Sequence, residues 1–493
     1  MSASAELPLF HVVGFTGHRQ MMDAPGVAGA IRSALTQLAQ EVKSNWVALS
    51  SVAAGSDQVF VREARALGLT WHAILPLPRA EFARDFSTEE WTTVESLLAA
   101  AEHVRVITEN GTREDAYLDC GMETVNSADL LLALWDGKPA RGRGGTADVI
   151  AYARELGRPL ILIDAQTLAI TRENFAQFKT GDAYLASLNQ LADVQTGWAT
   201  NPFRAPNEIF LFQQKCDHAA SQGAPQFRRL IVLTVLFHVS ATVVAAAGLA
   251  FGLHWLPLPW LKLACLLGAM GVAIVLRHHH LHHNWVRCRL AAEFCRSALA
   301  TWGLPRAAPL FQDVDLAGMR GLTRTLHILH SRSAMTQPVG LEEFRRVYLE
   351  TRIDDQLAYY RKQEARAYPL LGRLRQGFAI TTFLAIICTA AYALDHTFHL
   401  ELLGERGEQL VYYFLPITLP VVAAAFISFI SINDLQRRVA RYREMKVMLE
   451  EGRKQLSYSP TWNSLERVVL RIERALLQEV LEWHSITSFS ESH

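Results

Sequence analysis

The chain has 493 residues, which is too long for one ordinary domain and predicts two or three. Half of the residues are apolar and the formal net charge is zero, so no global electrostatic field points to a nucleic-acid-binding protein. The six cysteines include no CxxC pair and no zinc-site spacing, which favours reduced thiols in a cytoplasmic setting over a disulfide framework.

The first third of the chain alternates short β-rich runs with segments of helical length. The apolar runs are His11–Phe15, Trp46–Ser50, Thr70–Leu75, His103–Ile107, Leu130–Trp135 and Pro159–Ile163. This alternation predicts an α/β domain with a Rossmann-like, mostly parallel sheet that helices cover on both faces. Ligands of such sheets bind outside the carboxyl ends of the strands, so the residues that follow each run are the candidate site.

Three of these runs end in glycine-containing loops that lead into a helix. In the first, GFTGHR, backbone N–H groups can approach an anion, and His18 and Arg19 add side-chain donors. In the second, AAGSD, small residues permit close approach, and Asp57 either caps the helix or binds a ribose hydroxyl. The third, DGKPARGRGGT, is cationic and glycine-rich, as is typical of an anion-binding nest or of an exposed loop.

Taken together, the three loops predict a ligand-binding site on one edge of the sheet. Its candidate residues are Thr16, Gly17, His18, Arg19, Gly55, Ser56, Asp57, Asp136, Gly137, Arg143, Gly144, Gly145 and Thr146.

Residues 166–226 are mixed in character and punctuated by prolines, and we interpret them as a connector. Beyond them, four apolar runs are long enough to cross a hydrocarbon layer about 30 Å thick. These runs are Leu230–Leu253, Trp255–Leu276, Gly377–Leu394 and Leu410–Ile432. They form two hairpins followed by charged helices, which predicts an internal repeat of all-α two-span modules at residues 227–345 and 346–490.

Basic residues flank the outer ends of both hairpins, and the turns inside the hairpins have few. The positive-inside rule therefore predicts cytoplasmic termini and a cytoplasmic sheet domain. Polar side chains within the runs, His238, Thr242, Thr381 and Thr389, are candidates to line a pore, although hydrogen bonding between helices is their commoner use. The run RHHHLHH, residues 277–283, has histidine pairs at metal-ligand spacing, but polar anchoring at the membrane face is the simpler interpretation, and we predict no metal site.

The combination of GFTGHR, AAGSD and DG…GGT over residues 8–165 resembles the SLOG superfamily, relatives of the DNA-processing protein DprA and of LOG-type nucleotide phosphoribohydrolases. The hairpins, with YLETRIDDQLAYYRK ahead of the second, are similar to SLATT domains, two-span modules that accompany SLOG domains in bacterial conflict systems. The resemblance implies a nucleotide second-messenger sensor joined to a membrane effector that acts in antiphage (abortive infection) defence. The effector would form a homo-oligomeric pore or channel or disrupt the membrane.

The same resemblance implies a location in the bacterial inner membrane, with the lipid bilayer and a messenger-producing enzyme as partners. It implies no resident cofactor and no direct contact with nucleic acid. LOG-type enzymes cleave an N-glycosidic bond with a glutamate three positions beyond the threonine of a glycine-rich loop. Here that position is Val149, and Asp148 lies one position earlier, about 100° away on a helix.

We therefore predict no catalytic residue and favour sensing over hydrolysis. Two alternatives remain open. In the first alternative to sensing, the protein is a membrane-anchored N-glycosidic nucleotide hydrolase. In the second, it is a membrane scaffold whose sheet domain has lost its ligand.

Overall fold

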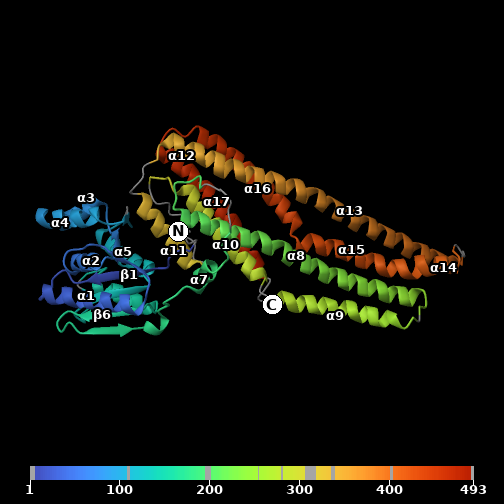
Figure 1. The fold of residues 1–493 in the computed structure, drawn as a ribbon, viewed down its shortest axis with the longest axis horizontal. Coiled ribbons are helices and arrows are strands. Elements are labelled where there is room, and N and C mark those ends of the chain that lie inside the picture. The colour runs from blue at the N-terminus through green and yellow to red at the C-terminus, as the bar shows by residue number, and fades with distance from the viewer. Residues whose placement is uncertain are drawn as a thin grey trace. The chain divides into compact units, whose positions relative to one another are not determined.

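The computed structural model describes residues 6–107, 111–140, 142–194, 201–253, 255–278, 281–305, 318–334, 339–399 and 403–489. Within these helices, the side chains of residues 223–228, 277–278, 281–283, 333–334, 483 and 485–489 are not described. The chain divides into two compact units (Figure 1). We call Met1–Gln190 with Leu304–Pro338 the sheet unit, and Leu191–Gly303 with Val339–His493 the helical unit.

The sheet unit contains a seven-stranded sheet in the order β4-β3-β2-β1-β5-β6-β7. The strands are β1 (Phe10–Gly17), β2 (Asn45–Ser50), β3 (Thr70–Leu75), β4 (His103–Val106), β5 (Leu130–Trp135), β6 (Leu160–Asp164) and β7 (Ile170–Glu173). Strands β1 to β6 pair in parallel and β7 pairs antiparallel to β6. The predicted α/β fold with a mostly parallel sheet is confirmed.

Helices cover both faces of this sheet, which is why its strands are continuous apolar runs. They are α1 (Ala24–Glu41), α2 (Ser56–Ala66), α3 (Arg79–Phe82), α4 (Thr88–Ala99), α5 (Arg113–Ser127), α6 (Thr146–Glu155), α7 (Ala183–Asn189) and α11 (Arg320–Ala334). On one face, Val13 packs in a core with Ile31 of α1 and Phe60 of α2. On the other face, Val12 packs in a core with Cys120 of α5 and Ile328 of α11.

The helical unit consists of long helices joined by short connections. They are α8 (Asn207–Ala250), α9 (Pro257–His278), α10 (Leu281–Thr301), α12 (Leu341–Tyr348), α13 (Asp355–Phe398), α14 (Glu405–Glu408), α15 (Leu415–Ile432), α16 (Leu435–Ser457) and α17 (Trp462–Phe489). Two π-helical turns, Leu349–Asp354 and Gln409–Phe414, continue the helices α12 and α14 into α13 and α15.

The two hairpins have matching architecture. Helices α8 and α13 each have 44 residues, and the second half of each is apolar. The partner span, α9 or α15, packs against this long helix, and the charged helix that follows, α10 or α16, packs against the same long helix. Each hairpin thus combines a long helix, a partner span and a charged helix that follows, and the predicted repeat of modules at residues 227–345 and 346–490 stays a prediction.

In the part of the chain that the structure describes, four helical stretches are long and apolar enough to cross a membrane. They are Arg229–Ala250, Pro257–Leu276 and the apolar parts of Leu341–Phe398 and Glu405–Ser457, as the hydropathy of the sequence predicts. Helix α9 packs on α8, α8 on α15, and α15 on α13, so the four lie side by side in a row (Figure 1). Only 6–17% of each apolar window is buried within the chain, so most of this surface needs lipid or another subunit to cover it.

Candidate functional site

The three glycine loops lie next to one another because their strands do. Strand β1 pairs with β2 on one side and with β5 on the other, and all three run in the same direction. The strand order reverses between β1 and β5, and ligands of open α/β sheets bind at such a switch point. The fold therefore places the three predicted loops at the edge where this architecture binds ligands.

The first and second loops are joined by direct contacts. The backbone N–H and the hydroxyl of Ser56 donate to the His18 carbonyl oxygen at 3.1 Å and 2.9 Å. Gly55 has a φ of +95°, and a Cβ there would lie 2.2 Å from the Arg19 carbonyl oxygen. A Cβ on Gly17 would lie 2.3 Å from the Ser56 hydroxyl oxygen. Glycine is therefore required at position 55 by its positive φ and by the approach of the Arg19 backbone, whereas a Cβ at position 17 would displace the Ser56 hydroxyl.

His18 joins the first loop to the third. The backbone N–H of Asp136 donates to His18 Nε2 at 3.0 Å, and Asp136 Oδ1 lies 3.1 Å from the same nitrogen. The backbone N–H of Lys138 lowers the pKa of the Asp136 carboxyl, and the nearby His18 adds to this effect. These two contacts of Nε2 tie the first loop to the third.

Arg19 is held by an aromatic ring that the sequence did not indicate. Its guanidinium carbon lies 5.5 Å from the ring centroid of Tyr117 on α5. The Tyr117 hydroxyl donates to Asp85, which also accepts from Arg113 Nε at 3.1 Å. Burial, together with the Asp85 carboxylate, raises the pKa of Tyr117. Arg19 is exposed and forms no ion pair within the described residues, so its N–H donors are available to an anion.

Helix α5 also supports the third loop. Arg143 Nη1 lies 2.9 Å from Asp115 Oδ1, and both side chains are partly exposed. Gly144 has a φ of +81°, and a Cβ there would lie 2.5 Å from the Leu118 backbone nitrogen. Helix α6 begins at Thr146, and the residue before it, Gly145, has no side chain that could cap the helix. No capping side chain therefore accepts the first backbone N–H groups of α6.

Val149 and Asp148, the two residues on which the prediction against hydrolysis rests, have structural roles. Val149 is 2% exposed and packs in a core with Leu131 and Leu160. The Asp148 carboxylate accepts the Gly144 backbone N–H at 2.9 Å and so closes its own loop. Val149 thus belongs to the core, and Asp148 stabilises the loop.

Asp57 is turned into the protein. Its side chain is 4% exposed and accepts from the hydroxyls of Ser51 at 2.7 Å and Ser50 at 3.3 Å. Burial raises the pKa of its carboxyl to about 6. Helix α2 begins at Ser56 after Gly55 without a side-chain cap. In this arrangement Asp57 supports the second loop from within, and a bond to a ribose would require its carboxylate to turn outward.

The predicted site residues therefore fall into three groups. Direct contacts between loops bring together Gly17, His18, Arg19, Gly55, Ser56 and Asp136. The loop that α5 supports contains Gly137, Arg143, Gly144, Gly145 and Thr146. The remaining two residues lie apart from these contacts, since Thr16 is near the end of β1 beside β5 and Asp57 is turned into the protein. Arg141 lies outside the described residues.

The polar side chains within the apolar runs bond to their own helices. His238 Nδ1 lies 2.8 Å from the Thr234 carbonyl oxygen, and the Thr242 hydroxyl donates to the His238 carbonyl at 3.0 Å. The hydroxyls of Thr381 and Thr389 each donate at 2.8 Å to the carbonyl one turn earlier. His238 is exposed although it lies within an apolar run, and ionisable groups at such positions usually face protein or water rather than lipid.

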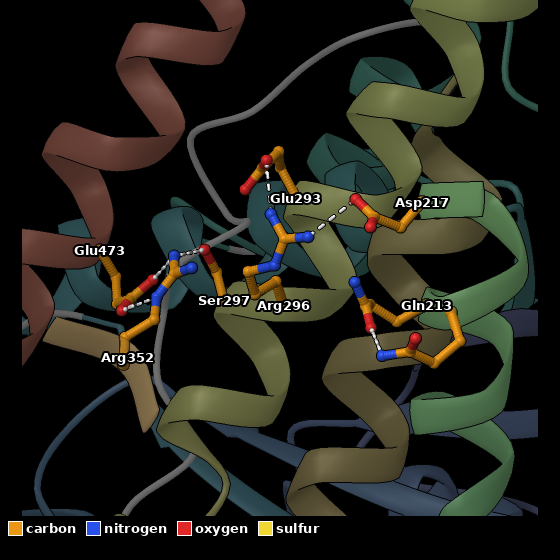
Figure 2. Close-up of polar contacts among 8 residues, drawn as sticks. Gln213, Asp217, Glu293, Arg296, Ser297, Arg352 and Glu473 are labelled. Carbon is orange, nitrogen blue, oxygen red and sulfur yellow. Dashed lines mark hydrogen bonds and ion pairs between the residues drawn. The ribbon is translucent and has the colours of Figure 1, made fainter. Parts of the chain in front are cut away.

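A buried ion pair joins distant helices of the helical unit (Figure 2). Arg352, in the π-helical turn before α13, is 1% exposed, and Glu473 of α17 is fully buried. Arg352 Nε donates to Glu473 Oε1 at 2.9 Å and Nη2 donates to Oε2 at 2.6 Å. Tyr348 donates to the same carboxylate at 2.8 Å, and Arg352 Nη2 reaches the Ser297 hydroxyl of α10 at 3.3 Å. The pair joins the start of α13 to α17, and the bond to Ser297 connects Arg352 to the helix that follows the first hairpin.

A second polar cluster lies beside this pair (Figure 2). Arg296 of α10 donates to Glu293 at 2.6 Å and to Asp217 of α8 at 2.9 Å. Among the described residues no group of three or more His, Cys, Asp or Glu side chains is arranged to hold a metal ion. The side chains of residues 277–283 are not described, so the histidine run lies outside that search.

Comparison with known families identifies one part of the chain. Residues 348–483 match the family described as "SMODS and SLOG-associating 2TM effector domain 1". The match covers the π-helical turn, α13 and its hairpin partner α15, α16 and most of α17. A search of curated proteins gives no match. The resemblance to SLATT domains is confirmed over this range, and the α/β domain implied by the SLOG resemblance is present while its assignment to SLOG stays a prediction.

Proposed function

We propose that this protein senses a nucleotide-derived second messenger at the carboxyl edge of its sheet and responds by opening or disrupting the inner membrane of a bacterium during antiphage defence. The observation that carries the proposal is the position of three glycine loops at the switch point of the sheet, together with the exposed guanidinium of Arg19, which forms no ion pair with the residues that the structure describes. The chain that bears them also contains a two-span effector domain. The messenger, the enzyme that makes it and the bilayer are the expected partners.

The chemistry of this edge suits a phosphate-bearing ligand. Helices α2 and α6 both begin without a side-chain cap at the edge where the parallel strands end, and Arg19 adds a planar donor. The carboxylates of Asp85, Asp115 and Asp148 accept from donors within the sheet unit. This arrangement favours binding of an anion over cleavage of its glycosidic bond.

The membrane step requires several copies of the chain. The four spans form a row with most of their surface unburied, and such a row encloses no lumen by itself. Homo-oligomers with closed symmetry are the usual way for identical subunits to cover such surfaces. The imidazole of His238 lies within an apolar run, where lipid would be an unfavourable neighbour. In an oligomer, His238 would instead face a neighbouring subunit or a water-filled passage.

Replacing Arg19 by alanine tests the sensing step. We expect the affinity for a phosphate-bearing nucleotide to fall at least about tenfold, because one charge-assisted hydrogen-bonding group is lost. The measurement is calorimetric titration of the full chain in detergent with nucleoside monophosphates, cyclic nucleotides and ADP-ribose. Mass spectrometry of co-purifying nucleotides selects the ligand to titrate first.

The matched control is Arg172→Ala, which removes an arginine that pairs with Glu41 at 2.8 Å and lies over the Phe175 ring, on the far edge of the same sheet. It should bind like the wild type. Dye release from liposomes should follow the bound nucleotide and be lost with Arg19→Ala. Release that is indifferent to every nucleotide and to Arg19→Ala would refute the proposal, and appearance of free base would favour the hydrolase.

A further inference from the structure

We propose that α11 transmits the state of the ligand edge to the second hairpin, with its docked position on the sheet holding the effector at rest. The inference rests on the proposed function and names how the same site is regulated. Helix α11 is set apart by its place in the chain: it follows the first hairpin in sequence but belongs to the sheet unit. The chain leaves the helical unit after α10, contributes α11 to the sheet unit, and then returns to α12.

The return connection is short. Only residues 335–340 separate the end of α11 at Ala334 from the start of α12 at Leu341. Since an extended chain advances at most about 3.6 Å per residue, this connection reaches no further than about 25 Å. Helix α12 continues through the π-helical turn into α13, so that Leu341–Phe398 form one helical stretch that contains the third candidate span. A docked α11 therefore restrains the start of that stretch.

Helix α11 docks against the amino-terminal ends of the strands, opposite the ligand edge. Arg324 donates to Asp129, which directly precedes β5, and the Thr325 hydroxyl donates to the Pro8 carbonyl before β1 at 2.8 Å. Arg332 donates to Glu102 before β4 at 3.0 Å and to the Thr70 hydroxyl at the start of β3 at 2.9 Å. These contacts hold α11 to four strands.

Helix α5 connects the two edges. Its first turns carry Tyr117, which lies against Arg19, and Leu118, whose backbone nitrogen lies beside Gly144. Its last residue, Ser127, is followed by Ala128 and Asp129, and Asp129 accepts both the Val12 backbone N–H at 2.8 Å and Arg324. Because a helix packed in a core moves as a rigid body, a shift of its first turn also displaces its last turn.

Ligand binding acts on this arrangement as follows. A phosphate that draws Arg19 and the Gly144 loop together displaces the first turn of α5, and the displacement moves Asp129 away from Arg324. Helix α11 then leaves the sheet and releases α12. The messenger favours the released state because only that state allows both loops to close on it, which supplies the difference in affinity that such a shift requires.

The test uses the full chain in liposomes with a trapped dye. The double variant Arg324→Ala/Arg332→Ala should raise amide hydrogen exchange in residues 320–332 and, with it, in residues 341–354. Dye release without nucleotide should rise at least about tenfold, within the usual range of coupling between sites. Arg172→Ala, which removes an ion pair of the same kind elsewhere on the sheet, is the control and should behave as the wild type.

Faster exchange in residues 320–332 with unchanged exchange in residues 341–354 would overturn the proposal. A second variant leaves all contacts of α11 in place, which keeps the test valid if the double variant does not fold. Inserting a flexible Gly-Ser segment within residues 335–338 should also raise nucleotide-free release. The same insertion within residues 195–200, near the first crossing between the two units, should not. Equal release from both insertions, or from neither, rejects α11 as the route.

These readouts separate the inference from the proposed function. If exchange in residues 341–354 follows α11 but no variant releases dye, the coupling stands and the proposed membrane step fails. If nucleotide releases dye from wild-type liposomes but residues 341–354 do not respond to loss of the α11 contacts, the coupling alone fails.

Discussion

Replacing Arg352 by methionine is expected to destabilise the helical unit by about 3–5 kcal/mol, because the fully buried Glu473 carboxylate then loses its counter-charge. Tyr348 would remain as a hydrogen-bond donor to that carboxylate, but a neutral donor does not offset a buried charge. Thermal or denaturant unfolding in detergent, followed by helical circular dichroism, measures the loss.

Two comparison variants test whether the loss of stability comes from the unpaired buried charge. Arg346→Met, close by in α12, removes an exposed ion pair with Glu350 and should change stability by less than about 1 kcal/mol. The double variant Arg352→Met/Glu473→Leu removes both charges and should recover most of the loss, since apolar replacements of a buried pair are often neutral. If Arg352→Met is as mild as Arg346→Met, the buried pair does not contribute to the stability of the helical unit as proposed.

The stability of the sheet unit should depend on pH through Asp57. Burial raises the pKa of this carboxyl from 3.8 to about 6, so the folded protein binds the proton more tightly than the unfolded chain. The resulting stabilisation is complete below pH 3.8 and is lost as the pH rises through about 6. The difference between the two pKa values corresponds to about 3 kcal/mol between pH 4 and pH 7.

Asp57→Asn should remove this dependence, and the informative quantity is the difference in unfolding free energy between variant and wild type at each pH. The control is Asp164→Asn, which acts with the opposite sign. The backbone N–H groups of Thr167 and Gln166 lower the pKa of Asp164, so its contribution is lost as the pH falls. Parallel stability curves for wild type and Asp57→Asn across this range would show that the Asp57 pKa is not raised.

Much of the fold follows from local pattern. Each of β1 to β6 coincides within a few residues with an apolar run, because a parallel sheet covered on both faces needs continuous apolar strands. Strand β7 escaped prediction because Ile170–Glu173 is short and partly polar, as an edge strand can be. The four apolar stretches were predictable from length and hydropathy alone, since every backbone polar group of a span must be satisfied within its own helix.

The sequence by itself determined the six parallel strands, which helices are apolar enough to cross a membrane, and which three loops follow neighbouring strands of the sheet. Only the tertiary structure decided what surrounds Arg19, where Asp57 turns, and that α11 belongs to the sheet unit. The reason is separation along the chain: Arg324 meets Asp129, and Arg352 meets Glu473, across more than a hundred residues. Periodicity reports which face of a helix is apolar, but the element that covers this face is chosen by packing, which no local pattern encodes.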